Sequence, residues 1–232
     1  MRLPVRAVTL DFGGTLDGPD HWRDRFWRVY DAAGLHPEKE DFERAFGFAT
    51  RAAYAEPRLR TVGLVGLVRF HVQEQMRELG WPTSNAVEDI VHRFVQDTRK
   101  ALHRHAALVR RWKERVRLGV ISNFYGNLAA ILAEEGLASL FPVVIDSALV
   151  GMRKPERAIF ELACAQLECE PEEVLHVGDS LEHDVLGACG AGMYAAWLNS
   201  RAGRDAGCSL PATAFPIARL ADLDECLSCK PQ

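Results

Sequence analysis

Residues 11–16 of this 232-residue chain read Asp11-Phe12-Gly13-Gly14-Thr15-Leu16. They follow the apolar run Val5 to Leu10, which is typical of a buried β-strand. The Gly13-Gly14 pair allows a tight turn at this point and exposes backbone amides. Asp11 is therefore expected at the carboxyl end of a strand, where its carboxylate either caps a turn or acts as a nucleophile.

The composition is that of an ordinary globular protein, with 48% hydrophobic and 26% charged residues. Its length allows one large domain, or a core domain with an insert. The formal net charge of -4 gives no support for a nucleic-acid or anionic-membrane partner. No stretch approaches the roughly 18 consecutive apolar residues that span a bilayer. The first residues run into the predicted strand without a signal-peptide pattern, and a cytoplasmic location is therefore expected.

The six cysteines are predicted to be free thiols, because a chain of this length without an export signal has little need of a disulfide framework. Cys226 and Cys229 have the C-x-x-C spacing of some metal and redox sites. They lie at the end of the chain and have no second ligand pair. We interpret this spacing as incidental.

About ninety residues after Leu16 have helical periodicity, and four helices are predicted there. Trp22, Phe26 and Tyr30 recur at helical spacing in the first helix. We interpret them as core of a small helical bundle, with a substrate platform as the alternative. The other predicted helices cover Glu38 to Tyr54, Val62 to Leu79, and a segment carrying Val87, Ile90, Val91, Phe94 and Val95.

From Arg104 onward, strands alternate with helices. The predicted strands are Val116 to Ile121, Val143 to Ile145, Val174 to Val177 and Met193 to Leu198, and the predicted helices are Leu128 to Glu135, Pro155 to Leu167 and Leu181 to Cys189. This alternation indicates an α/β fold with a Rossmann-like, mostly parallel sheet and helices on both faces. Residues 1–16 and 104–232 would form this core, and residues 17–103 an inserted, all-helical domain.

Polar residues follow two of these strands at positions where ligands gather in parallel sheets. Ser122 and Asn123 are either an ordinary turn or, with the adjacent amides, a cradle for a phosphoryl oxygen. Lys154 stands in a loop before a Pro-started helix, with Arg153 as a competing cation. A lone loop lysine is normally a solvated charge.

Asp179 ends a further predicted strand, and Asp184 lies in the first turn of the next predicted helix. Acidic groups at a helix N-terminus favour its dipole, so capping is the plain interpretation. Clustered with Asp11, however, these carboxylates would make an oxygen-only site that suits Mg²⁺.

Taken in order, the four clusters closely resemble the four motifs of the haloacid dehalogenase (HAD) superfamily, from Val5 to about Leu198. In its phosphatases the first motif usually reads Asp-x-Asp-Gly-Thr-Leu. The first Asp of that motif attacks phosphorus, and the second is the general acid/base. Here Asp11 stands in the first place and Gly13 in the second. The helical block sits where HAD proteins with a C1-type cap carry theirs.

This resemblance implies a Mg²⁺-dependent hydrolase of small phosphorylated metabolites that works through an aspartyl-phosphate on Asp11. Ser122, Asn123 and Lys154 would hold the phosphoryl group, and Lys154 would also stabilise charge in the transition state. The implied metal ligands are Asp11, the backbone carbonyl of Gly13, Asp179 and Asp184.

The glycine at position 13 leaves the source of the proton open. Without a carboxyl group there, protonation of the leaving group and activation of water should be lost, an effect of about 10²–10⁴-fold. Either the substrate has a good leaving group, or a neighbouring side chain such as Asp17, Asp20 or His21 supplies the proton.

Two other functions also fit a HAD protein without the second Asp. Haloacid dehalogenases and phosphonatases lack it, but dehalogenases generally lack metal carboxylates such as Asp179. Phosphonatases need a cap lysine, for which only Lys39 and Lys100 are near. The remaining alternative is a phosphate-binding or partner-binding protein with residual chemistry.

Overall fold

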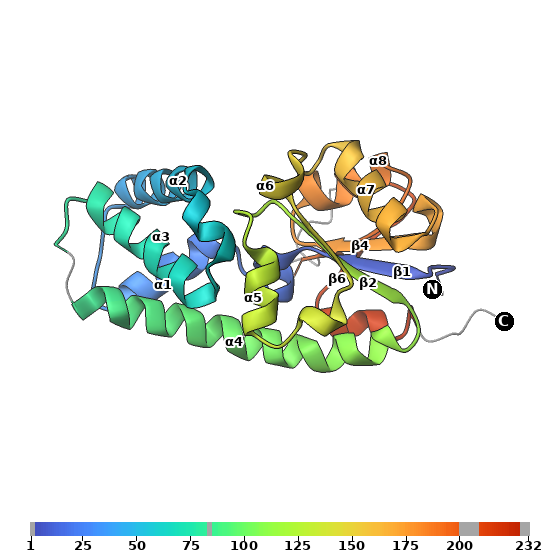
Figure 1. The fold of residues 1–232 in the computed structure, drawn as a ribbon, viewed down its shortest axis with the longest axis horizontal. Coiled ribbons are helices and arrows are strands. Elements are labelled where there is room, and N and C mark those ends of the chain that lie inside the picture. Colours follow the sequence, from blue (N-terminus) through green and yellow to red (C-terminus); the bar gives the residue numbers. More distant parts are fainter. Residues whose placement is uncertain (1–2, 83–84, 200–208, 228–232) are drawn as a thin grey trace.

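The computed structural model describes residues 3–82, 85–199 and 209–227, which form two lobes side by side (Figure 1). One of them, the sheet lobe, is built on a parallel sheet. Its strands are β1 (Ala7–Leu10), β2 (Arg117–Ser122), β3 (Val143–Asp146), β4 (Val174–Gly178), β5 (Tyr194–Leu198) and β6 (Ala214–Ile217). Their order across the sheet is β3-β2-β1-β4-β5-β6, and the predicted α/β fold is confirmed.

The central strand β1 is buried and pairs in register with β2 and β4. Its residues are buried throughout, and Val8 and Leu10 pack on one face of the sheet while Ala7 packs on the other. In register, Leu10 pairs with Val120 of β2 and Val177 of β4. The carboxyl ends of β1, β2 and β4 therefore lie at the same edge of the sheet.

Helices cover both faces of the sheet (Figure 1). On one face, the second half of α4 (Asn85–Lys113), α5 (Leu128–Glu134) and a short 3-10 helix at Leu220–Asp224 share a core with β1 and β2. On the other face, α7 (Arg157–Leu167) and α8 (Gly187–Gly190) pack against β1 to β5. The four-residue helix α6 (Ser147–Val150) follows β3 directly.

The second lobe, which we call the helical lobe, is an insertion between β1 and β2. It consists of α1 (Trp22–Ala32), α2 (Lys39–Ala55), α3 (Leu64–Glu78) and the first half of α4. Gly34 and Gly80 follow α1 and α3 with positive φ, a conformation that ends a helix at little cost. At 29 residues, and about 1.5 Å per residue, α4 is long enough to run under both lobes (Figure 1).

The elements differ from the predicted ones at three places. The fourth predicted helix continues without a break to Lys113 and so crosses residues 103 and 104, between which the sequence places the domain boundary. That boundary stays a prediction. The strand β6 was not predicted at all. The predicted helix from Leu181 to Cys189 is a π-helical turn, Leu181–Leu186, followed by α8.

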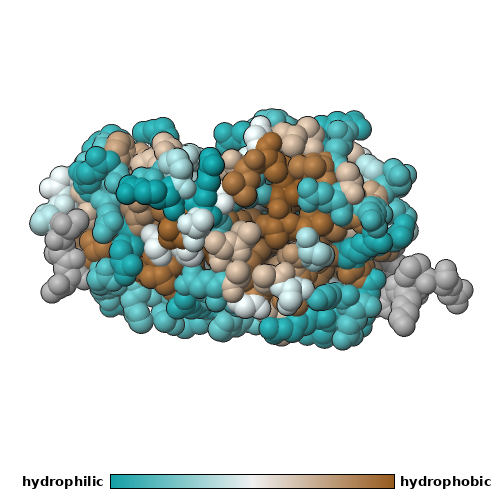
Figure 2. All heavy atoms as spheres, in the orientation of Figure 1, coloured by the Kyte–Doolittle hydropathy of each residue, from teal (hydrophilic) through white to brown (hydrophobic). Residues whose placement is uncertain are grey.

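No helix in the described ranges is both long and apolar enough to cross a membrane. Cys164, Cys169, Cys189 and Cys226 are free thiols, as predicted, whereas Cys208 and Cys229 lie outside the described residues. Figure 2 shows polar side chains over much of the helical lobe and an apolar area over the sheet lobe near α6. Leu149 of α6 is one of the exposed large apolar side chains.

Candidate active site

The predicted site residues converge on one cavity of about 320 Å³ between the two lobes. The sheet lobe contributes its floor from the carboxyl edge of the sheet, and α1 and α2 contribute part of its wall. The lining residues that the sequence singles out for chemistry are Asp11, Gly13, Ser122, Asn123, Arg153, Lys154, Asp179 and Asp184. Residues more than 170 positions apart in the chain are thus brought together, because their strands end at the same edge.

Lys154 is the central cation of this site. Only 2% of the residue is exposed, and its Nζ atom lies 2.7 Å from Oδ1 of Asp11 and 2.5 Å from Oδ1 of Asp184. Burial opposes its charge, but the two carboxylates outweigh burial and raise the pKa of Lys154. Arg153 lines the same cavity at its exposed rim. The cation beside the candidate nucleophile is therefore Lys154.

Asp11 is held from two sides. Its Oδ1 atom accepts hydrogen bonds from the Ser122 hydroxyl at 2.9 Å and from Lys154. Burial raises the pKa of Asp11 to about 6, although Lys154 acts in the opposite direction. The Lys154 ammonium and the Ser122 hydroxyl both favour the charged form, which is the form that can act as a nucleophile.

A buried chain of hydrogen bonds fixes Asp184. Its Oδ1 accepts from Lys154 and lies 3.1 Å from Nε2 of His176, and its Oδ2 accepts from the Ser180 amide at 3.0 Å. The Thr9 hydroxyl is 2.9 Å from Nδ1 of the same histidine. Burial opposes ionisation of Asp184, but Lys154 and His176 hold its pKa below the ordinary value. These partners favour the charged form of Asp184, which anchors the lysine.

The side chain of Asn123 is bonded to the backbone of Lys154. Its side-chain amide donates to the Lys154 carbonyl and accepts from the Lys154 amide, both at 2.9 Å. The side chain lines the cavity, but both of its polar atoms are engaged with the backbone of the lysine. This arrangement sets where Lys154 enters the site.

Three carboxylates could hold a cation. Oxygen atoms of Asp11, Asp179 and Asp184 all lie within 4.8 Å of one another. Burial raises the pKa of Asp179 to about 8, and the nearby charges of Asp11 and Asp184 add to this effect. Three acidic groups with one buried ammonium leave an excess of negative charge. A hard divalent cation such as Mg²⁺ fits this oxygen-only set.

Two glycines let the carboxylates come this close. A Cβ atom at Gly14, whose φ is +79°, would lie 2.4 Å from Oδ2 of Asp179. A Cβ atom at Gly178 would lie 2.2 Å from Cγ of Asp184. Any larger residue at either position would push an acidic side chain out of the cluster.

Gly13 faces the cavity with an ordinary backbone, at φ -74° and ψ 123°. A Cβ atom there would meet Trp22 Cδ1 at 3.8 Å, which is normal van der Waals contact. The indole of Trp22 therefore lies beside the place where the usual carboxyl group would start. Its Nε1-H donates to Oδ2 of Asp17 at 2.5 Å, so this N-H is already used.

Of the three neighbouring groups that could replace the acid, only His21 lines the cavity. Asp17 is fully buried and accepts from the Gly14 amide and from Arg25, at 2.9 and 2.7 Å. Asp20 pairs with Arg28 at 2.8 Å on the surface. The Nδ1 atom of His21 accepts from a backbone amide, which places the proton of a neutral ring on Nε2.

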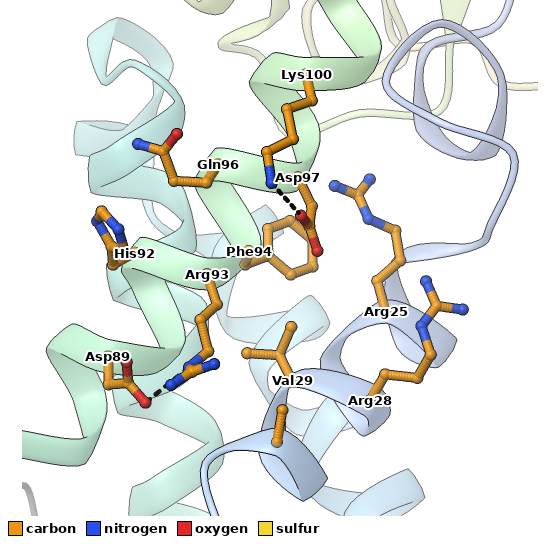
Figure 3. Close-up of a pocket in the computed structure, with 11 residues that line it drawn as sticks. Arg25, Arg28, Val29, Asp89, His92, Arg93, Phe94, Gln96, Asp97 and Lys100 are labelled. Atoms are coloured by element: carbon orange, nitrogen blue, oxygen red, sulfur yellow. Dashed lines mark hydrogen bonds and ion pairs between the residues drawn. The ribbon is translucent and has the colours of Figure 1, made fainter.

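A larger hollow of about 620 Å³ lies elsewhere, between α1 and α4 (Figure 3). Its charged groups are satisfied locally: Arg93 pairs with Asp89 at 2.8 Å, and Lys100 with Asp97 at 3.5 Å. Arg25 stacks on Phe94 with its guanidinium turned to Asp17. This hollow holds no carboxylate cluster and no candidate nucleophile.

Residues 5–192 match the family of haloacid dehalogenase-like hydrolases. This stretch contains all four motifs and the buried lysine. The chain belongs to this family. The human haloacid dehalogenase-like hydrolase domain-containing protein 3 is 30% identical over 210 residues, which cover 83% of this chain and 81% of that protein. The phosphoserine phosphatase of Thermus thermophilus is 28% identical over 206 residues, 85% of this chain and 83% of that enzyme.

A glyceraldehyde 3-phosphate phosphatase of Methanothermobacter thermautotrophicus is 26% identical over 160 residues, 69% of this chain and 62% of that enzyme. For this and two other curated relatives, the chain spans 62, 51 and 38% of their length, which is less than two thirds. Among solved structures, the HAD hydrolase YfnB of Bacillus subtilis, bound to magnesium, has a TM-score of 0.57 at 15% identity over 99% of this chain and all of that one. A dehalogenase with an intermediate complex has a TM-score of 0.64 at 16% identity, with the same coverage. At such identities these two structures show the shared fold.

Sequence reasoning missed His176, because none of the histidines has metal-ligand spacing. Thr9 and His176 are direct neighbours on paired strands, and this pairing would have placed them together. It also treated Trp22 as core. The residue is 95% buried and packs in the core, yet its edge lines the cavity. Its side chain is therefore part of both the core and the cavity wall.

Proposed function

We propose that this hydrolase is a Mg²⁺-dependent phosphatase that acts on a small phosphorylated metabolite. The observation that carries the proposal is the buried Lys154, which sits between Asp11 and Asp184 at the floor of a cavity. A positive charge so placed draws a phosphoryl group to the carboxylate that will attack it. The relationship to two named phosphatases supports this reaction class.

In this mechanism Asp11 is the nucleophile. Ser122 and Lys154 hold its Oδ1 atom, which leaves Oδ2 to form the bond to phosphorus. The bond from phosphorus to the ester oxygen breaks, and the leaving group takes the electron pair. Lys154 and Ser122 then hold the oxygens of the transferred group. Water attacks the aspartyl-phosphate, and phosphate leaves with Asp11 restored.

Mg²⁺ would be held by Asp11, Asp179 and Asp184 with the carbonyl of Gly13, and would neutralise charge on the transferred phosphoryl group. The helical lobe would act as a C1-type cap, because α1 and α2 contribute His21, Trp22 and Tyr54 to the cavity wall. Substrate selection would then lie with these cap side chains.

The rival functions have less support. A dehalogenase needs no cluster of three carboxylates, and the dehalogenases among the solved structures share only the fold. A phosphonatase needs a second lysine, from the cap, in the cavity. Lys39 and Lys100 line other hollows instead.

A panel of phosphorylated metabolites and 2-haloacids, assayed with and without Mg²⁺, tests the proposal. Release of phosphate that requires Mg²⁺ and stops in EDTA is expected. Asp179→Asn should raise the Mg²⁺ concentration needed for half activity, because one anionic ligand is lost. Glu182→Gln, an exposed change in the turn that follows, is the matched control. Halide release in EDTA would instead identify a dehalogenase, and no turnover at all would favour a binding protein.

A further inference from the structure

A continuous band of aromatic rings leads from the nucleophile loop to the mouth of the cavity. Trp22 contacts Phe124 with ring centroids 5.7 Å apart, and Phe124 contacts Tyr125 at 5.0 Å. Tyr125 contacts Tyr54 at 4.8 Å. All four residues line the cavity, and Tyr54 at the outer end is 42% exposed. We call these four residues the aromatic band.

The aromatic band starts where an acid is missing. Trp22 lies against Gly13, and its indole N-H is bound to Asp17. Neither side chain can therefore give a proton to a leaving oxygen. A leaving group that receives no proton here departs more readily the more stable it is as an anion. Alkoxides are poor in this respect, whereas phenolates, enolates and carboxylates are better.

We propose that the substrate is the phosphate monoester of an aromatic hydroxyl group, whose ring packs on the aromatic band. This inference rests on the proposed phosphatase function. Asp11 forms the bond to phosphorus, the bond to the ring oxygen breaks, and the electron pair leaves on the phenolate. The phenolate takes its proton from water. A cavity of about 320 Å³ is small for a ligand site and suits one ring with its phosphate.

Four phosphate esters separate the two parts of this inference, the ring and the leaving group. Phenyl phosphate has both, benzyl phosphate has a ring but an alkoxide leaving group, acetyl phosphate has a good leaving group without a ring, and glycerol 3-phosphate has neither. With Mg²⁺ present, kcat/KM for phenyl phosphate is expected to exceed that for each of the other three.

Each other outcome overturns a distinct statement. Equal kcat/KM for acetyl and phenyl phosphate would show that the ring contributes nothing. Equal values for benzyl and phenyl phosphate would show that a proton donor exists, with His21 the residue to test. Either result overturns the inference and leaves the phosphatase function standing. No turnover of any of the four esters also overturns the inference, and the panel of phosphorylated metabolites with Mg²⁺ then tests the phosphatase function separately.

A variant pair tests the aromatic band directly. Tyr54→Leu keeps an apolar side chain at an exposed position but removes the ring, and it should lower the ratio of kcat/KM for phenyl over acetyl phosphate by about three- to tenfold. Trp27→Leu removes a similarly exposed ring, 38% exposed, that packs on Phe42 outside the cavity. That ratio should stay unchanged in Trp27→Leu. An unchanged ratio in Tyr54→Leu would overturn the inference.

Discussion

The indole of Trp22 lies against Gly13, so that a Cβ atom at position 13 would sit 3.8 Å from Trp22 Cδ1. This contact explains how the nucleophile loop tolerates the absence of a carboxyl group: an aromatic edge closes the space beside it. It also means that the backbone at Gly13, with its negative φ, accepts other residues without strain. The backbone conformation thus does not require glycine at position 13. The main consequence of the glycine is that the loop has no carboxyl group there.

Gly13→Asp is expected to raise turnover of alkyl phosphates such as glycerol 3-phosphate, by up to about 10²-fold, because it restores a general acid. The gain is limited by Trp22, against which the new carboxyl group must fit. Gly13→Asn is the matched control, since it has the same size and no acid. Steady-state kinetics with alkyl phosphates are measured for both variants. An equal rise in turnover in both would show that acid catalysis is not the cause.

Lys154→Met should lower kcat by about 10²–10³-fold, because the preorganised cation beside the reacting group is lost. Lys100→Met removes an exposed lysine of the helical lobe and should behave like the parent. If Lys154→Met stays active and Arg153→Met does not, the catalytic cation is the arginine at the rim.

The buried pair of Arg25 and Asp17 should contribute to stability through the helical lobe. Its side chains are 6 and 0% exposed, and removing one partner strands the other charge. Arg25→Met should lower the free energy of unfolding by about 3–5 kcal/mol in urea titrations. Arg93→Met breaks an exposed pair of the same hollow (Figure 3) and should cost less than about 1 kcal/mol. A similar loss of unfolding free energy in both variants would contradict the claim that the buried Arg25–Asp17 pair stabilises the fold.

His71 should make stability depend on pH. Burial lowers its pKa from 6.5 to about 3, so below pH 6.5 the unfolded chain binds a proton that the folded chain does not. Folded stability therefore falls as the pH falls from about 6.5 to 3, by about 1.4 kcal/mol per pH unit. His71→Gln, which can keep the contact to Tyr125, should remove this component. Urea unfolding at several pH values measures the free energy of unfolding of parent and variant. The difference between these two free energies should not change with pH above pH 6.5. If it also stays constant below pH 6.5, His71 does not cause the pH dependence.

Three of the candidate site residues could be placed from the sequence because each lies at the carboxyl end of an apolar strand. Asp11, Ser122 and Asp179 all lie at one edge as a consequence of parallel pairing. The strand β6 escaped prediction because it is a four-residue edge strand that contains Pro216. The length of α4 could have been predicted. Apolar residues continue the helical period past residue 103, at Ala106, Val109 and Trp112.

The contacts between side chains could not be predicted in the same way. The pairing of Asn123 with the Lys154 backbone depends on how two loops meet, which no local pattern encodes. The same holds for Asp17, whose place near the nucleophile loop in sequence suggested an acid. In three dimensions its carboxylate is enclosed by Trp22 and Arg25 and supports the loop through the Gly14 amide.

The central claim is that Asp11 carries the phosphoryl group during turnover. The direct measurement is peptide mass spectrometry of the protein, quenched in acid soon after mixing with phenyl phosphate and Mg²⁺. The account predicts phosphate on the peptide that contains Asp11, and neither phosphate nor turnover in a folded Asp11→Asn variant. Phosphate on another residue, or turnover by Asp11→Asn within a few-fold of the parent, would contradict it.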